Sequence, residues 1–331
     1  MKAQKMILAS LLLAAFSANA EMEGSIGSVD FSADISGAVD YVEDGDWTGR
    51  DMFLKLDAKV AERIGIVYEG GVVQNALDDL DGDSLTTRQA YVYVNVGSLK
   101  YLGQIELRVG KQELAFGGKT TESINRTTSE RDAMQENLRE RESVKIMIAR
   151  DSMEGRSITA LLNNLVTSAE ISYWDDEEDG LEKGHSIRIN GQIGEFVDTS
   201  VSYMEDSEMD LDGNEVEATL NLDAISRSPL LNRATISAAV AEMNYGAETE
   251  KITRFAATKG YGKYSAYYEM EDVEVSGGSE EGQFKNHAVG VRRSFGEKFD
   301  VGFEVKDDEQ LDDVVGAITF RYNMFYIMFV M

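Results

Sequence analysis

Side chains that could carry out catalysis are few in this chain of 331 residues. There is no cysteine, and the histidines are His185 and His287. Acid–base hydrolysis usually needs a histidine held beside a nucleophile and an orienting acid. No serine or acid stands at a spacing from either histidine that selects such a partner. The sequence therefore predicts a protein that is not an enzyme, and a barrel hydrolase is the less favoured alternative.

Two acidic turns, Asp79–Asp83 and Asp210–Asn214, look like fragments of a calcium-binding loop. An EF-hand needs a bidentate Glu at its twelfth position. Aligned on the glycine of each turn, that position holds Arg88 or Thr219. We therefore predict solvated acidic turns, with no dedicated metal site and no cofactor, although weak bridging by divalent cations stays open.

The overall charge narrows the choice of partners. The chain has 60 acidic and 32 basic side chains, a net charge of -28. Nucleic-acid binding depends on a basic surface that displaces counterions. We therefore expect no nucleic-acid partner.

The first twenty residues resemble a secretory signal. Lys2 and Lys5 precede the apolar run 6–16, and Ala18–Ala20 is a small-x-small cleavage site. The apolar run is too short for a transmembrane helix, which needs about 20 residues. We predict a signal peptide over 1–20, export through the Sec pathway, and a mature domain over 21–331.

The mature sequence repeats short alternating segments separated by polar turns. In Val29–Tyr41 the odd positions are mostly apolar, whereas Asp30, Ser32, Asp34, Ser36 and Asp40 occupy even positions. Such alternation gives a strand one apolar and one polar face. A soluble sandwich would turn the apolar face to a core, whereas a membrane barrel turns it to lipid. Charged polar faces and strand lengths near 9–11 residues favour an all-β, transmembrane antiparallel β-barrel.

The number of strands follows from the connections. About 17 alternating segments can be marked, but bacterial barrels usually have an even number. If 157–174 forms one interrupted strand, the count is 16, and 18 is the alternative. The acidic connections at 75–86, 175–184, 205–214 and 271–283 then all lie outside the cell.

One connection, between Val109 and Val144, is far longer than the others. Long loops in compact barrels are usually functional. Alternation places Lys55, Lys59 and Arg108 on the inner face. Charged groups that line a channel tune its selectivity.

The stretch Phe116-Gly117-Gly118 and the strand Arg88–Val92 resemble those of Gram-negative outer-membrane porins, the general diffusion superfamily. The resemblance implies that residues 112–142 fold inward as a constriction loop, and that Arg88 lines the channel. It also implies a homotrimer in the outer membrane of a Gram-negative bacterium, in contact with lipid and lipopolysaccharide. The loop residues that it assigns to the constriction are Glu113, Phe116, Gly117, Gly118, Glu122, Arg126, Glu130 and Arg131.

The expected function is passive diffusion of ions and small hydrophilic solutes, with a preference for cations or weak selectivity. Arg108–Lys111 followed by Phe116-Gly117 is also similar to phosphate-selective porins. Anion capture needs clustered cations without compensating acids, and here acids are interleaved, as in Arg139–Glu142. A channel selective for phosphate, polyphosphate, a siderophore or an oligosaccharide stays the alternative.

Overall fold

The computed structural model describes residues 25–26, 29–41, 47–61, 63–72, 85–99, 103–116, 140–150, 164–176, 181–206, 210–225, 228, 231–278, 281–295, 299–308 and 313–324. Side chains are described for most of the residues between Leu54 and Asp307 within these ranges. The predicted signal peptide over 1–20 lies outside the described residues, and so does the chain after Met324.

Nearly every described residue belongs to a β-strand or to a turn between strands. The strands are β1 Ser25–Ile26, β2 Val29–Tyr41, β3 Trp47–Ala61, β4 Ile64–Val72, β5 Leu85–Leu99, β6 Gly103–Glu113, β7 Glu140–Ala149, β8 Ser168–Asp176 and β9 Leu181–Ile193. They continue with β10 Val197–Asp206, β11 Leu211–Asn221, β12 Ala234–Tyr245, β13 Glu248–Tyr261, β14 Tyr264–Ser276, β15 Gly282–Phe295, β16 Phe299–Asp308 and β17 Asp313–Met324. One short helix, α4, spans Leu222–Ile225 between β11 and β12. Among the described residues, no helix is long and apolar enough to cross a membrane.

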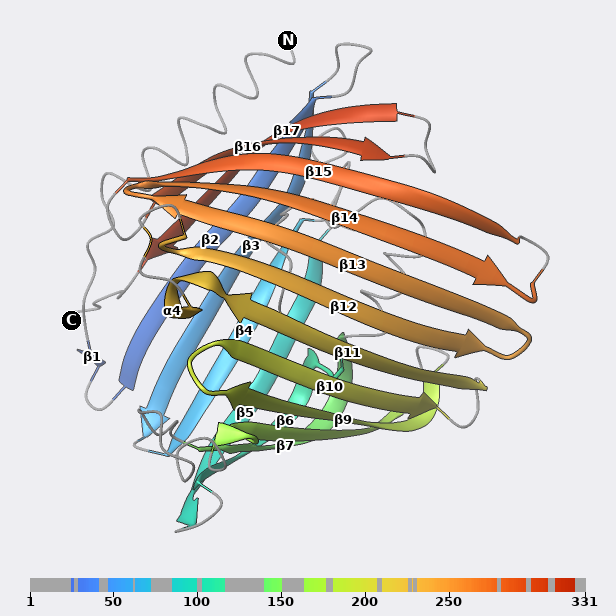
Figure 1. Cartoon of the computed structure of the whole chain (residues 1–331). Coiled ribbons are helices and arrows are strands. Elements are labelled where there is room, and N and C mark those ends of the chain that lie inside the picture. The colour runs from blue at the N-terminus through green and yellow to red at the C-terminus, as the bar shows by residue number, and fades with distance from the viewer. Residues whose placement is uncertain are drawn as a thin grey trace.

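The strands from β2 to β17 pair in chain order, each antiparallel to the next. The last strand, β17, also pairs with β2, so the series of pairings returns to its start. Figure 1 shows the result: β11–β15 cross in front, and β2–β5 run behind them. The two-residue strand β1 pairs with β2. The described part of the chain thus forms an antiparallel β-barrel of 16 strands, which confirms the predicted fold and excludes the 18-strand alternative.

Alternation along each strand separates two faces. Outward residues are apolar and exposed: Val201, Val216, Val240 and Val289 are each more than half accessible. Their neighbours along the same strands, such as Ser202 and Glu217, are almost fully buried inside the ring. Apolar-out and polar-in is the pattern of a barrel whose outside contacts lipid.

Local backbone features fix the register of the ring. Gly97 adopts φ 132° where the β5–β6 register shifts, and its N–H bonds Asn95 Oδ1 at 3.2 Å. A bulge of this kind needs a residue without a Cβ, because positive φ strains other side chains. At the tight turns, Gly246 and Gly262 adopt φ near 60°. These turns end β12 and β13 sharply and bring the next strand back in register.

The barrel has two rims. We call the rim where β2 begins and β17 ends the terminal rim, and the other the opposite rim. The acidic connection predicted at 271–283 lies at the opposite rim and is partly strand: β14 runs on to Ser276, and β15 starts at Gly282. The reason is apolar packing, because Val273 and Val275 are buried inside the ring against Ile252. Within 164–176, one strand is present, β8, as the 16-strand count requires.

Candidate functional site

The interior of the barrel is the candidate site, and its charges are divided between two walls. Alternation with the outward apolar rows places these described cations inside β3–β9: Lys55, Lys59, Arg108, Arg141, Lys145 and Arg188. The inward acids of the same wall are Asp57, Glu69, Glu106 and Glu170. On β10–β16 acids predominate: Asp198, Asp206, Glu215, Glu217, Glu250, Glu269, Glu271 and Glu304, beside Arg254 and Arg292. The ring therefore sets a wall rich in cations opposite an acidic one.

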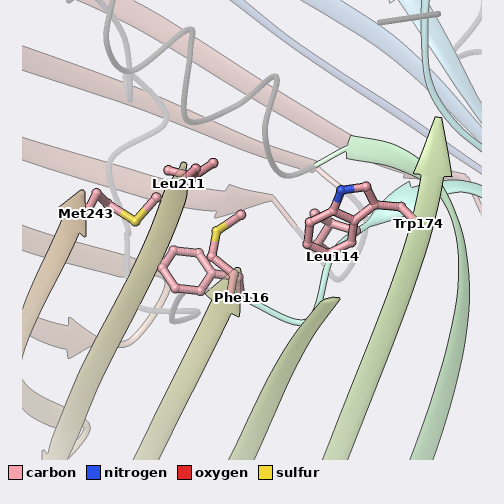
Figure 2. Packing of buried hydrophobic residues seen from close by; sticks show 6 residues of the cluster. Leu114, Phe116, Trp174, Leu211 and Met243 are labelled. Carbon is pink, nitrogen blue, oxygen red and sulfur yellow. The ribbon is translucent and has the colours of Figure 1, made fainter. Parts of the chain in front are cut away.

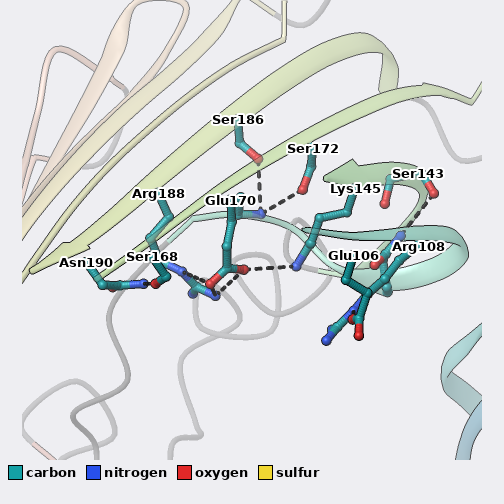
Figure 3. A network of polar contacts seen from close by, with 12 residues as sticks. Glu106, Arg108, Ser143, Lys145, Ser168, Glu170, Ser172, Ser186, Arg188 and Asn190 are labelled. Carbon is teal, nitrogen blue, oxygen red and sulfur yellow. Dashed lines mark hydrogen bonds and ion pairs between the residues drawn. The ribbon is translucent and has the colours of Figure 1, made fainter. Parts of the chain in front are cut away.

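A buried ion cluster lies at the centre of the β3–β9 wall. Arg188 Nη2 donates to both carboxylate oxygens of Glu170, at 2.9 and 2.8 Å, and Lys145 Nζ lies 3.5 Å from the same carboxylate. All three side chains are nearly inaccessible. Figure 3 shows them on adjacent strands, with Arg108 nearby. Two cations around one acid leave this part of the wall positive.

The residues that follow β6 turn onto this inner wall. Ala115 N–H donates to Ser172 Oγ at 3.0 Å and to Ser186 Oγ at 3.1 Å, and these serines lie opposite each other on β8 and β9. Gln112 Nε2, at the end of β6, donates to the Ser143 carbonyl at 3.0 Å. Because Ser172 and Ser186 face inward, the chain at Ala115 has entered the ring.

An apolar cluster also holds the residues that follow β6 against the inner wall. Leu114 packs near Trp174, and Phe116 extends toward Leu211 and Met243 on β11 and β12 (Figure 2). At Gly213 on β11, a Cβ atom would clash with Met243 and lie 3.2 Å from the Phe116 ring. The missing side chain at Gly213 thus makes room for the end of Met243, against which the edge of the Phe116 ring also lies. Residues 114–116 therefore lie against the inner wall of the barrel.

The predicted lining cations occupy different positions on the wall. Arg108 Nε bonds Glu106 Oε1 at 2.7 Å, and its guanidinium lies 5.1 Å above the centre of the Tyr91 ring. Lys55 Nζ lies 3.8 Å from Glu69, whereas Lys59 is exposed.

Arg88 lies on β5, where the β4–β5 register shifts between Glu69 and Gly70, and its side chain is not among those described. Because of this register shift, alternation along β5 does not decide which face of the barrel Arg88 occupies.

Most residues predicted in the constriction loop lie outside the described ranges: Gly117, Gly118, Glu122, Arg126, Glu130 and Arg131. Phe116 is described and is buried in the apolar cluster with Leu211 and Met243. Glu113 is the last residue of β6, is exposed, and pairs in register with Glu140.

The sequence analysis missed the residues that form the centre of the wall. Lys145 alternates with Val144 and Ile146, so the same parity rule that selected Arg108 could have selected it. Glu170 and Arg188 needed the pairing of β8 with β9, which sets them opposite each other. Glu170 and Arg188 are 18 positions apart in the sequence, and this spacing alone does not predict that they contact each other.

Both histidines lie on outward rows. His185 stands beside Tyr203, with Nε2 4.0 Å from Glu205 Oε2, and His287 Nδ1 lies 3.0 Å from the Tyr268 hydroxyl. Within the described ranges, no group of three or more His, Asp or Glu side chains is placed to hold a metal ion. The predicted turn Asp210–Asn214 is mostly strand, because β11 starts at Leu211.

The sequence matches no family model and no curated protein. Solved structures match the fold over most of the chain. OmpF of Salmonella typhi, in complex with daunomycin, has a TM-score of 0.63 at 10% identity, covering 89% of this chain and 97% of its own. The anion-selective porin of Comamonas acidovorans has a TM-score of 0.58 at 11% identity, covering 89% and 99%. OmpT of Vibrio cholerae, in trimer form, has a TM-score of 0.56 at 15% identity, with the same coverage. The strand ring, the charged interior and these likenesses together show that the chain has the fold of the bacterial outer-membrane porins.

Proposed function

We propose that this protein is an outer-membrane porin, a water-filled channel for passive diffusion of ions and small hydrophilic solutes. The observation that carries the proposal is the division of faces, with exposed valines outside the ring and charged side chains inside it. An apolar exterior fits lipid, and a charged interior fits water and solutes. The segment Leu114–Phe116 supports a narrowed channel, because it starts the connection of β6 to β7 along the inner wall.

We propose that the channel prefers cations. The acidic β10–β16 wall outweighs the excess of cations on β3–β9, and rings of acidic groups favour cation passage. The two walls also create a field across the channel that orients dipolar solutes. The cation cluster at Lys145 and Arg188 surrounds Glu170, so it does not offer clustered cations free of acids for anion capture.

The test is single-channel conductance and reversal potential in planar bilayers under a KCl gradient. We expect a cation-selective reversal potential that weakens in Asp198→Asn with Glu269→Gln, both on the inner acidic wall. The matched control, Glu242→Gln with Glu274→Gln, removes two outward acids and should leave the reversal potential unchanged. Absence of conductance would refute the channel, and anion selectivity with block by phosphate would support the phosphate-selective alternative instead.

We also propose that the protein is not an enzyme, and that it forms a homotrimer in contact with lipid and lipopolysaccharide. The outward position of both histidines supports the first statement, and the trimer form of Vibrio OmpT supports the second. Replacing both histidines by Gln should leave conductance unchanged. The mass of the native complex in detergent tests the trimer, and a monomer would contradict it.

A further inference from the structure

A group of basic side chains lies on the outward face at the terminal rim. It consists of Lys259 at the end of β13, Lys263 in the turn that follows, and Arg293 on β15. We call these three the terminal basic patch. The aromatic side chains Tyr261, Tyr264 and Phe295 lie among them, and Tyr261 is 81% exposed.

The patch is unusual in a chain with 60 acidic residues. The strand ends that form it, residues 231–237, 256–268 and 288–295, contain no Asp or Glu. In the described part of the barrel, none of its three cations takes part in an ion pair with a carboxylate.

The outward lysines at the opposite rim behave differently. Lys183, Lys251 and Lys285 each lie 3.4 to 3.8 Å from the carboxylate of Asp175, Glu242 or Asp272. The three outward lysines at the opposite rim are thus matched with the protein's own acids, whereas the cations of the terminal basic patch are not.

Rings and a main-chain carbonyl hold the patch in place. The Arg293 guanidinium lies 5.3 Å from the centre of the Tyr264 ring and 4.5 Å from that of Phe295. Lys259 Nζ donates to the main-chain carbonyl of Asn232. Each contact leaves further N–H donors of the same side chain available to an anion.

The patch borders the apolar exterior. Along β15 the outward row continues from Arg293 to Val291 and Val289, both half exposed, and along β14 from Tyr264 to Tyr268. Tyrosines and basic side chains at the end of an apolar band lie at the level of lipid headgroups. The phosphate of a lipid at that level would meet the three cations, while its acyl chains contact the valines.

We infer that the terminal basic patch binds the phosphate headgroup of an anionic phospholipid in the membrane leaflet at the terminal rim. The inference rests on the proposed placement in the outer membrane, but not on channel activity. Charge complementarity carries it, together with the adjacent apolar rows.

The experiment is native mass spectrometry of the full protein in detergent, titrated with phosphatidylglycerol or with phosphatidylcholine of the same acyl chains. We expect wild type to bind phosphatidylglycerol more tightly. The triple variant Lys259→Gln, Lys263→Gln, Arg293→Gln should lose at least about tenfold in affinity for it, because each basic side chain near an anionic surface contributes roughly fivefold. Binding of phosphatidylcholine should stay unchanged.

The matched control is Lys183→Gln, Lys251→Gln, Lys285→Gln, which removes the same charge at the opposite rim. Its affinity for phosphatidylglycerol should stay within about twofold of wild type, because those lysines face acids. Lys263→Gln alone, in an exposed turn, keeps the test valid if the triple variant folds poorly, and should lose about two- to fivefold.

Three results would overturn the inference. The first is equal loss in the patch variant and in the control, which would indicate a general effect of charge. The second is displacement of the lipid by millimolar inorganic phosphate, which would indicate a site for the free anion. The third is unchanged lipid binding with a change of oligomeric mass in the patch variant, which would make the patch a subunit interface. Conductance recorded on the same samples tests the channel separately.

Discussion

At the scale of single residues, the stability of the inner wall depends on one buried acid, Glu170, that forms ion pairs with two cations. Glu170 is nearly inaccessible and contacts both Arg188 and Lys145. Removing a charge from water is costly, and only close partners offset that cost. Loss of the acid therefore leaves two buried cations together, whereas loss of Arg188 leaves one acid with one cation.

We predict that Glu170→Gln lowers the free energy of unfolding by about 3–5 kcal/mol, and Arg188→Gln by less. Glu242→Gln, which removes the acid of the exposed pair with Lys251, should cost less than about 1 kcal/mol. Urea titrations in lipid vesicles, followed by tryptophan fluorescence, measure all three. A smaller loss for Glu170→Gln than for Arg188→Gln would contradict this account of the cluster.

At the scale of elements, the barrel holds the start of the β6–β7 connection by one main-chain donor. Ala115 N–H is buried and shared between two serine hydroxyls. A buried donor with no acceptor costs about 1–3 kcal/mol, whereas a donor that keeps one of two acceptors loses little.

We predict strong non-additivity in a double-mutant cycle. Ser172→Ala and Ser186→Ala should each cost less than about 1 kcal/mol in unfolding free energy, and the double variant about 1–3 kcal/mol more than their sum. Ser200→Ala, on the inner face of β10, is the control and should cost little in any background. Additive losses would show that the two hydroxyls do not share Ala115.

At the scale of the whole molecule, closure of the ring depends on one pairing between distant parts of the chain. β17 and β2 are joined in register, with Ala38 opposite Thr319 and Gly37 opposite Phe320. Residues opposite each other on antiparallel strands have Cα atoms about 4.5–5.5 Å apart, within the range of a disulfide.

The absence of native cysteines allows a direct test of closure. We predict that Ala38→Cys with Thr319→Cys forms a disulfide under mild oxidation of the folded protein, seen as a shift in gel mobility that a reductant reverses. Ala38→Cys with Phe320→Cys should not, because a slip of one residue turns the side chains to opposite faces. Crosslinking of both pairs to the same extent would contradict the register.

Much of the fold could be predicted from local pattern. The alternation of Val29–Tyr41 predicted β2 with both of its bounds, because a strand's side-chain period of two is a local property. The same parity put Arg108 inside, and it could have put Lys145 there. Parity was insufficient where a register shift intervenes, as at Arg88, since a bulge adds one residue to one strand.

By itself, the sequence determined the all-β class, the apolar exterior and the charged interior, since each follows from the period of alternation. The choice of 16 strands over 18 needed the pairing of β17 with β2. Only the tertiary structure decided which charges meet. It set Glu170 against Arg188, and it packed Met243 into the space left by Gly213. It also divided the described interior into a wall rich in cations and an acidic one. The physical reason is that such contacts depend on strand register and on closure of the ring, and neither is encoded in the spacing of residues along one strand.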